Sequence, residues 1–92
     1  MKTIIERHKL FVKDFLKIKF TDEHFAKFVK YISLLSDGKN LPIEAKEHPL
    51  VGEFLGYREF HIGGDLLVIY KIEDNCLKLI RIGTHSALFK KF

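Results

Sequence analysis

Hydrophobic positions along this chain keep a helical period in the first half and change to short runs in the second half. The weak alternation and the β-branched residues of Thr3–Arg7 predict a short strand. Phe11, Phe15 and Ile18 then recur at i, i+4 and i+7. This spacing predicts an amphipathic helix from about Lys9 to Lys19.

A second helix is predicted between Thr21 and Gly38, because threonine is a favoured N-cap and glycine suits the left-handed conformation that ends a helix. Asp22 and Glu23 occupy its first turn, where carboxylates interact favourably with the helix dipole. The apolar residues of this helix recur at helical spacing, so we expect them to be buried: Phe25, Phe28, Val29, Ile32 and Leu35.

No hydrophobic period survives between Lys39 and about Glu53, which predicts a long irregular segment. Loops of this length are uncommon in small domains unless they carry a function. Three strands separated by short turns are predicted after it: Phe54–Ile62, Leu66–Ile72 and Leu77–Ile82. The middle strand is apolar on both faces, so we place it at the centre of the sheet.

The element order β-α-α-β-β-β predicts an α+β fold, in which two N-terminal helices pack on one face of a small, mostly antiparallel sheet. A chain of 92 residues has room for one core, so we assign residues 1–92 to a single domain. Apolar residues make up 47% of the chain, and nine phenylalanines allow a core without disulfides or a structural metal. Cys76 is the only cysteine, which excludes an internal disulfide and is typical of a reducing cytoplasm.

The N-terminal residues are too charged for a signal peptide, and no apolar run approaches the roughly 20 residues of a membrane span. We therefore expect a cytoplasmic protein without membrane contact. Sixteen lysines and arginines against twelve acidic residues give a net charge of +4, which suits a polyanionic partner such as RNA.

Side chains with useful chemistry collect in the second half of the chain. Histidines titrate near neutrality, arginine offers phosphate a fixed charge, and an aromatic ring stacks on a base. These are the groups that a metal-independent ribonuclease needs, and we expect no cofactor. The candidate catalytic residues are His48, His61, Asp65, Arg81 and His85, with Phe89 following the last strand.

Some of these residues have more than one interpretation. Asp65 either orients a histidine or caps the turn that precedes it. Phe89 either fixes the C-terminus to the core or stacks on a base of the substrate. The chemistry also permits a metal site, although its four residues lack the compact spacing of known metal motifs: His48, His61, Asp65 and His85.

Several segments of the second half resemble one known family. The chain contains HPL from residue 48, GYR from residue 56, IYK from residue 69 and RIGTHSALF from residue 81. With His61 and Asp65 between them, these segments closely resemble the YafQ-type toxins of the RelE superfamily, without gaps from about Pro42 to Phe89. The combination is specific, and the helical half agrees in layout.

The resemblance implies a RelE-like fold and a toxin of a type II toxin–antitoxin system. Such a toxin is a ribosome-dependent endoribonuclease, which cuts mRNA in the ribosomal A site and is held inactive by a cognate antitoxin. The implied partners are that antitoxin protein and mRNA on the ribosome with its rRNA, without DNA contact by the toxin itself. Family functional positions map onto His48, His61, Asp65, Arg81, His85 and Phe89, and we add four substrate-binding candidates: Lys46, Arg58, Lys90 and Lys91.

One position departs from the family pattern. The residue after the aspartate is commonly tryptophan in these toxins and is Leu66 here, which removes an aromatic surface near the predicted site. A rival interpretation is a non-catalytic toxin of the RelE/ParE fold that acts on a protein target such as gyrase. Members of that kind lack the histidine set, so His48, His61 and His85 favour RNA cleavage.

Overall fold

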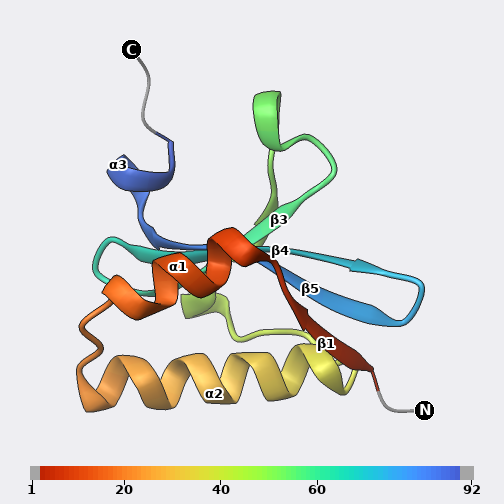
Figure 1. Ribbon diagram of the computed structural model, residues 1–92. Helices are drawn as coiled ribbons and strands as arrows, with labels where there is room; N and C mark the ends of the chain where they lie inside the picture. The colour runs from red at the N-terminus through yellow and green to blue at the C-terminus, as the bar shows by residue number, and fades with distance from the viewer. Residues whose placement is uncertain (1–2, 90–92) are drawn as a thin grey trace.

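A five-stranded sheet lies at the centre of the computed structural model, which describes residues 3–89 (Figure 1). The strands are β1 (Ile4–Arg7), β2 (His48–Pro49), β3 (Arg58–Gly63), β4 (Leu66–Glu73) and β5 (Cys76–Thr84). Their spatial order is β1-β5-β4-β3-β2; β1 runs parallel to β5, and the other neighbours are antiparallel. The predicted α+β class and the central position of β4 are therefore confirmed.

Two helices, α1 (Lys9–Lys17) and α2 (Asp22–Ser36), cover one face of the sheet (Figure 1). Thr21 caps α2 as predicted, because its side chain accepts a hydrogen bond from the backbone of the first turn. α1 ends at Lys17 instead of Lys19, since Ile18 adopts an extended conformation. Among the residues described, no helix combines the length and hydropathy that a membrane span requires.

The buried stripe of α2 is rotated from the predicted one. Tyr31 and Leu35 are buried, and Phe28 packs against the same core. Phe25 and Val29, which the spacing predicted to be buried, are 47% and 50% exposed. At 100° per residue these two positions lie on the flank of the stripe that faces the sheet, so the prediction was wrong for them.

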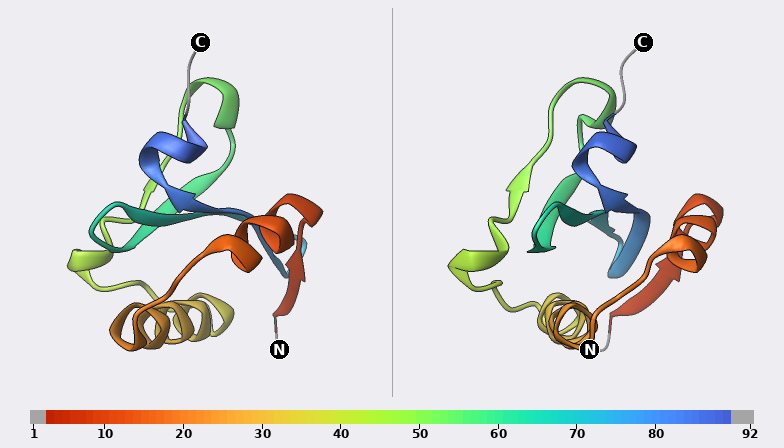
Figure 2. Two further views of the ribbon diagram at one scale, coloured as in Figure 1. Left: turned by 60° about the vertical axis from the view of Figure 1, so that its left-hand side comes forward. Right: turned by 90° about the vertical axis from the view of Figure 1, so that its left-hand side faces the viewer.

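Side chains of the sheet alternate between two apolar clusters, one on each face. In the helix-side cluster, Phe60, Val68 and Ile82 pack with phenylalanines of the two helices: Phe11, Phe15 and Phe28. On the opposite face, which we call the second face, Leu67 and Ile69 form a smaller cluster with residues outside the sheet. Figure 2 shows that α3 (His85–Leu88) and the chain between β2 and β3 lie over this second face.

The chain between α2 and β3 is more ordered than the predicted loop. It contains two short 3₁₀ turns, η1 (Ile43–Ala45) and η2 (Gly52–Phe54), and the two-residue strand β2. β3 begins at Arg58 instead of Phe54, because Gly56 adopts φ 94° and turns the chain before the strand. The predicted element order lacked β2 and α3, since elements this short leave no hydrophobic period to detect.

Candidate active site

A buried carboxylate lies between two histidines on the second face. β2 pairs with β3 so that His48 lies opposite Glu59, and His61 follows Glu59 two residues later on the same side of β3. The Oε2 atom of Glu59 is 2.8 Å from Nε2 of His61 and 3.3 Å from Nε2 of His48. Glu59 is only 3% exposed, whereas both histidines reach solvent. We call these three residues the histidine–glutamate cluster.

The backbone of Lys46 fixes the tautomer of His48. Nδ1 of His48 lies 2.8 Å from the carbonyl oxygen of Lys46, and a carbonyl only accepts, so Nδ1 carries a proton. Lys46 presents this carbonyl from a left-handed conformation with φ 48°, directly after η1. The other ring nitrogen, Nε2, faces Glu59. A histidine and a carboxylate in this arrangement are able to pass a proton.

The same three side chains could also hold a metal ion. One ligand atom from each of them lies within 4.8 Å of the others. Two imidazole nitrogens and a carboxylate oxygen are donors that Zn²⁺ and Cu²⁺ accept. The metal site suggested by the sequence included Asp65 and His85, which are not part of this group. It did not include Glu59, which belongs to the group.

His85 lies at the start of α3, directly after β5. The hydroxyl of Thr84 caps this short helix by accepting from the backbone N–H of Ala87 at 3.2 Å. The backbone N–H of His85 donates to the carbonyl oxygen of Asp65 at 3.1 Å, so Asp65 positions His85 through its main chain. The imidazole is exposed and lies 4.7 Å from the ring of Phe89. Both predicted roles of the Asp65 side chain stay predictions.

Arg81 is held by a carboxylate from α1. Its Nε and Nη2 atoms donate to the two oxygens of Asp14 at 2.7 and 3.0 Å. These hydrogen bonds raise the pKa of Arg81, so its charge is fixed at any physiological pH. Within residues 3–89, the guanidinium makes no other hydrogen bond, so its remaining N–H groups can bind a phosphate.

The strand register aligns these groups in one row across the sheet. His48 pairs with Glu59, Glu59 pairs with Ile69, and Ile69 pairs with Arg81. Neighbouring strands lie about 4.8 Å apart, so the Arg81 backbone is roughly 10 Å from that of Glu59. A register shift beside Arg81 accompanies the turn of its side chain toward α1. The structure thus brings the cluster and Arg81 to the same level of the sheet, with Ile69 between them.

Arg58 belongs to a different part of the molecule. It lies opposite Tyr70, which packs in the helix-side cluster, and it donates to both carboxylate oxygens of Glu47. The hydrogen bond with Glu47 raises the pKa of Arg58, and burial raises the pKa of Tyr70. The structure therefore separates Arg58 from the histidine–glutamate cluster and gives it a structural ion pair. Lys90 and Lys91 lie outside the described residues.

Known proteins share both the sequence and this arrangement of elements. The family described as the bacterial toxin of type II toxin–antitoxin systems, YafQ, matches residues 3–90. This chain belongs to the YafQ toxin family. The mRNA interferase toxin YafQ of Escherichia coli K12 is 44% identical to it over 63 residues, which cover 66% of this chain and 68% of that protein.

Two solved structures extend the likeness to the whole fold of this toxin. A copper-bound mutant toxin from Helicobacter pylori superposes with a TM-score of 0.86 at 32% identity, covering 95% of this chain and 99% of the other. The toxin of the E. coli DinJ–YafQ toxin–antitoxin complex gives a TM-score of 0.79 at 34% identity, covering 97% and 99%. The predicted RelE-like fold and toxin class are confirmed.

Sequence reasoning missed two acidic residues of this YafQ-family site. Glu59 stands two residues before His61 in a predicted strand, so the alternation of β3 was a signal that both share a face. Asp14 is 67 positions from Arg81, and no local pattern joins them. Leu66, the position that departs from the family pattern, packs against the helix-side cluster, away from the second face.

Proposed function

We propose that this toxin is a ribosome-associated endoribonuclease, which cleaves mRNA by attack of the substrate's own 2′-hydroxyl on the adjacent phosphate, without a metal ion. The observation that carries the proposal is the contact of Glu59 with His48 and His61 on the sheet face that α3 covers. The reaction needs one group that accepts a proton and another that donates one. The name of the E. coli relative, mRNA interferase, agrees with this chemistry.

Proton transfer is divided between the cluster and His85. A histidine of the cluster, His48 or His61, takes the proton of the 2′-hydroxyl as the O2′–P bond forms, and Glu59 stabilises the resulting imidazolium. His85 gives a proton to the 5′-oxygen as the P–O5′ bond breaks. The upstream fragment then ends in a 2′,3′-cyclic phosphate, and the downstream fragment begins with a 5′-hydroxyl. Each transfer contributes typically ~10²–10⁴-fold to the rate.

Fixed cations balance the charge that develops on the pentacoordinate phosphate. Arg81 is oriented by Asp14 and keeps N–H groups for the phosphate oxygens. Lys46 is exposed next to His48 and suits the adjoining backbone. Lys90 and Lys91, outside the described residues, stay substrate-binding candidates from the sequence. Phe89 is only partly buried beside His85, where its ring can stack on a base.

A metal ion in the histidine–glutamate cluster would compete with this chemistry. The Helicobacter pylori relative is described as copper-bound, and the donor atoms of the cluster fit such an ion. A metal ion bound there would supply Lewis-acid charge. The ion would occupy the Nε2 atoms of His48 and His61, which otherwise contact Glu59, and so would disrupt the proton transfer. We therefore expect an excess of Zn²⁺ or Cu²⁺ to slow cleavage.

Control by an antitoxin is part of the same proposal. The E. coli relative was crystallised as a toxin–antitoxin complex with DinJ. We infer that a cognate antitoxin covers the site of this toxin in the cytoplasm. The net charge of +4 favours an acidic partner segment there.

Cleavage of a message on translating ribosomes tests the proposal. We expect His85→Ala to lower cleavage by about 100-fold or more with an unchanged circular dichroism spectrum. His8→Ser is the matched control, because His8 caps α1 away from the site and serine preserves the cap. The isolated upstream fragment should end in a 2′,3′-cyclic phosphate, whereas a 3′-hydroxyl end would point to attack by water and refute the mechanism.

A further inference from the structure

An open cavity of about 520 Å³ lies on the second face, between η2 and α3. Figure 1 shows both segments on the side of the sheet that faces away from α2. The volume falls in the roughly 300–1,000 Å³ range of small-molecule sites. His85 forms part of the wall together with Glu53, Phe54 and Phe89, so the cavity borders one of the candidate catalytic residues.

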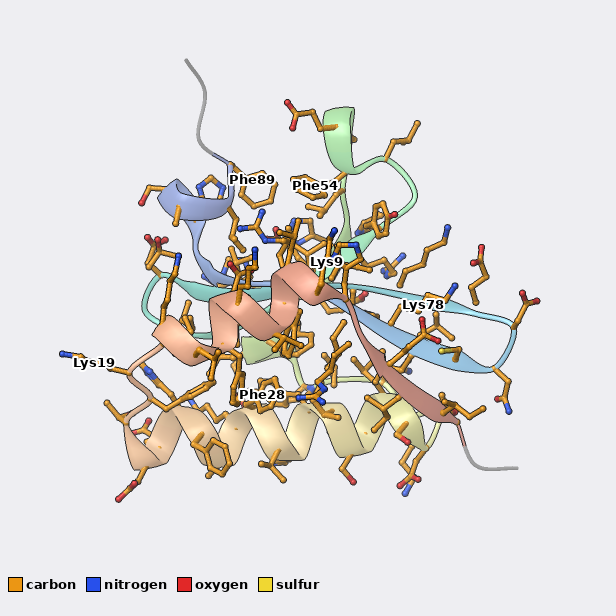
Figure 3. The ribbon with its side chains drawn as sticks, viewed as in Figure 1. Lys9, Lys19, Phe28, Phe54, Lys78 and Phe89 are labelled. Atoms are coloured by element: carbon orange, nitrogen blue, oxygen red, sulfur yellow. The ribbon has the colours of Figure 1, made fainter. Side chains whose placement is uncertain are left out.

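Within residues 3–89, Phe54 has no near-parallel ring neighbour. Its contacts with Tyr57 and Phe89 are edge-on, with interplanar angles of 80° and 73°. Phe89 differs, because the imidazole of His85 lies at only 30° to it. Figure 3 shows the labelled rings of Phe54 and Phe89 next to each other, from the two segments that line the cavity. Among the residues described, Phe54 thus meets other rings only at steep angles, and it is suited, beside Phe89, to stack on another flat group.

Glu53 is the acidic residue of the cavity wall. Within residues 3–89, no hydrogen bond or ion pair engages its carboxylate, and the residue is exposed. An ionised carboxylate only accepts hydrogen bonds. Adenine, cytosine and guanine carry an exocyclic amino group that donates, whereas uracil carries carbonyl oxygens in the corresponding places. A carboxylate here therefore favours amino-bearing bases.

We propose that this cavity is a nucleobase slot, in which a base beside the scissile phosphate stacks on Phe54 and donates from its amino group to Glu53. The inference rests on the proposed function, because His85 is the group that joins the cavity to the reacting phosphate. Phe54 supplies stacking, which every base accepts. Glu53 discriminates between amino-bearing bases and uracil. The two residues together determine which messages the toxin prefers.

Ribosome-bound messages that differ in one base beside the cleavage site test this slot with the full chain. We expect the wild-type kcat/KM to be about tenfold higher for messages with A, C or G than for messages with U at one position next to the cleavage site. Glu53→Gln should remove that preference, because an amide donates to uracil as readily as it accepts. Phe54→Leu should lower cleavage with all four bases by roughly five- to a hundredfold. Leu55→Ala is the control, since Leu55 is 74% exposed on the same segment and lies outside the cavity wall.

An unchanged base preference in Glu53→Gln, or wild-type cleavage by Phe54→Leu, overturns the slot. So does a result in which both variants change only the affinity for an antitoxin, because the surface would then bind protein. If the wild type cleaves no RNA at all, the proposed function fails, and titration with AMP and UMP decides the slot by itself. NMR signals of the Phe54 ring should then shift more with AMP than with UMP, and equal or absent shifts contradict the inference.

Discussion

Glu47 joins separate parts of the chain at the end of the sheet opposite the turn that carries Asp65. Its carboxylate accepts hydrogen bonds from the Arg58 side chain at 2.9 Å and from the Tyr70 hydroxyl at 2.6 Å. The hydrogen bond from Arg58 lowers the pKa of Glu47 below its ordinary value of 4.5 and outweighs the opposite effect of burial. The folded protein therefore favours the ionised form of this residue.

We expect the stabilisation from Glu47 to disappear in acid. Its folded pKa lies below the unfolded value of 4.5, so the stabilisation is complete above that pH and is lost as pH falls through the folded pKa. Glu47→Gln should lower the free energy of unfolding by about 1–3 kcal/mol at neutral pH. This difference from the wild type should shrink as the pH is lowered into the acid range. Urea unfolding measures the difference, with Glu53→Gln as a control, because its exposed carboxylate makes no hydrogen bond or ion pair within residues 3–89. A deficit that stays constant with pH would show that the charge of Glu47 is not the cause.

Individual residues were predictable from sequence where a neighbour in the chain marks their role. Thr21 is an example, because an N-cap is defined by the turn that follows it. The partners of Arg58 and Arg81 were not predictable, since Glu47 is 11 positions away and Asp14 is 67 positions away. Only the packing of α1 and of η1 against the sheet brings these carboxylates to their arginines.

At the level of elements, α1 closes the open edge of β5. β1 pairs with β5 only as far as Leu79, so the following part of β5 lacks a neighbour on that side. Asp14 fills the place of the missing strand by accepting from the backbone N–H of Ile82 at 3.1 Å. The same carboxylate holds the Arg81 guanidinium. The position of α1 thereby sets the direction in which Arg81 points.

Asp14→Asn should weaken catalysis through Arg81. The asparagine oxygen can still accept the hydrogen bond from the backbone N–H of Ile82. An amide, however, lacks the two charged oxygens that accept from the Arg81 guanidinium. We expect kcat to fall by roughly 10- to 100-fold with little change in KM, because misplacement of a positioned group acts on the chemical step. Leu16→Ala on the same helix, at a position 81% exposed, is the control. A folded Asp14→Asn variant with the wild-type kcat would show that Asp14 does not position Arg81 for catalysis.

Elements were predictable where their residues carry a local pattern, as in the β-branched four-residue strand β1. The period of α1 and the apolar run of β4 placed both correctly, while α3 and β2 were too short to leave a signal. This limit concerns the site directly, because β2 carries His48 and α3 begins with His85. The family resemblance, and not the hydrophobic pattern, indicated these two histidines as partners.

At the level of the whole molecule, the two faces of the sheet have different tasks. The helix-side cluster contains most of the buried phenylalanines and tyrosines, so it supplies most of the stability. The second face has a smaller cluster and carries the histidine–glutamate cluster and the open cavity. With the net charge of +4, we expect RNA to approach the second face and to be held there partly by its phosphates.

Binding of RNA should therefore weaken with salt. We expect the logarithm of the affinity of the His85→Ala variant for a single-stranded RNA to fall linearly with the logarithm of the salt concentration. The slope should be about −0.7 for each phosphate neutralised. Lys46→Gln should reduce this slope by about that amount. Lys27→Gln should leave it unchanged, since Lys27 lies on α2, which covers the opposite face (Figure 1), and its amine pairs with Glu23 at 3.8 Å. Equal slopes for all three proteins would exclude Lys46 from the RNA contact.

The most direct measurement replaces a single 2′-hydroxyl of the substrate. A message with one 2′-deoxy nucleotide immediately upstream of the cleavage position would be bound to ribosomes and incubated with the wild-type toxin in parallel with the all-ribose message. If the histidine–glutamate cluster activates the substrate's own hydroxyl, cleavage at that position stops while the ribose control is cut to a 2′,3′-cyclic phosphate. Cleavage of the deoxy-substituted message at the same position and rate would contradict the mechanism.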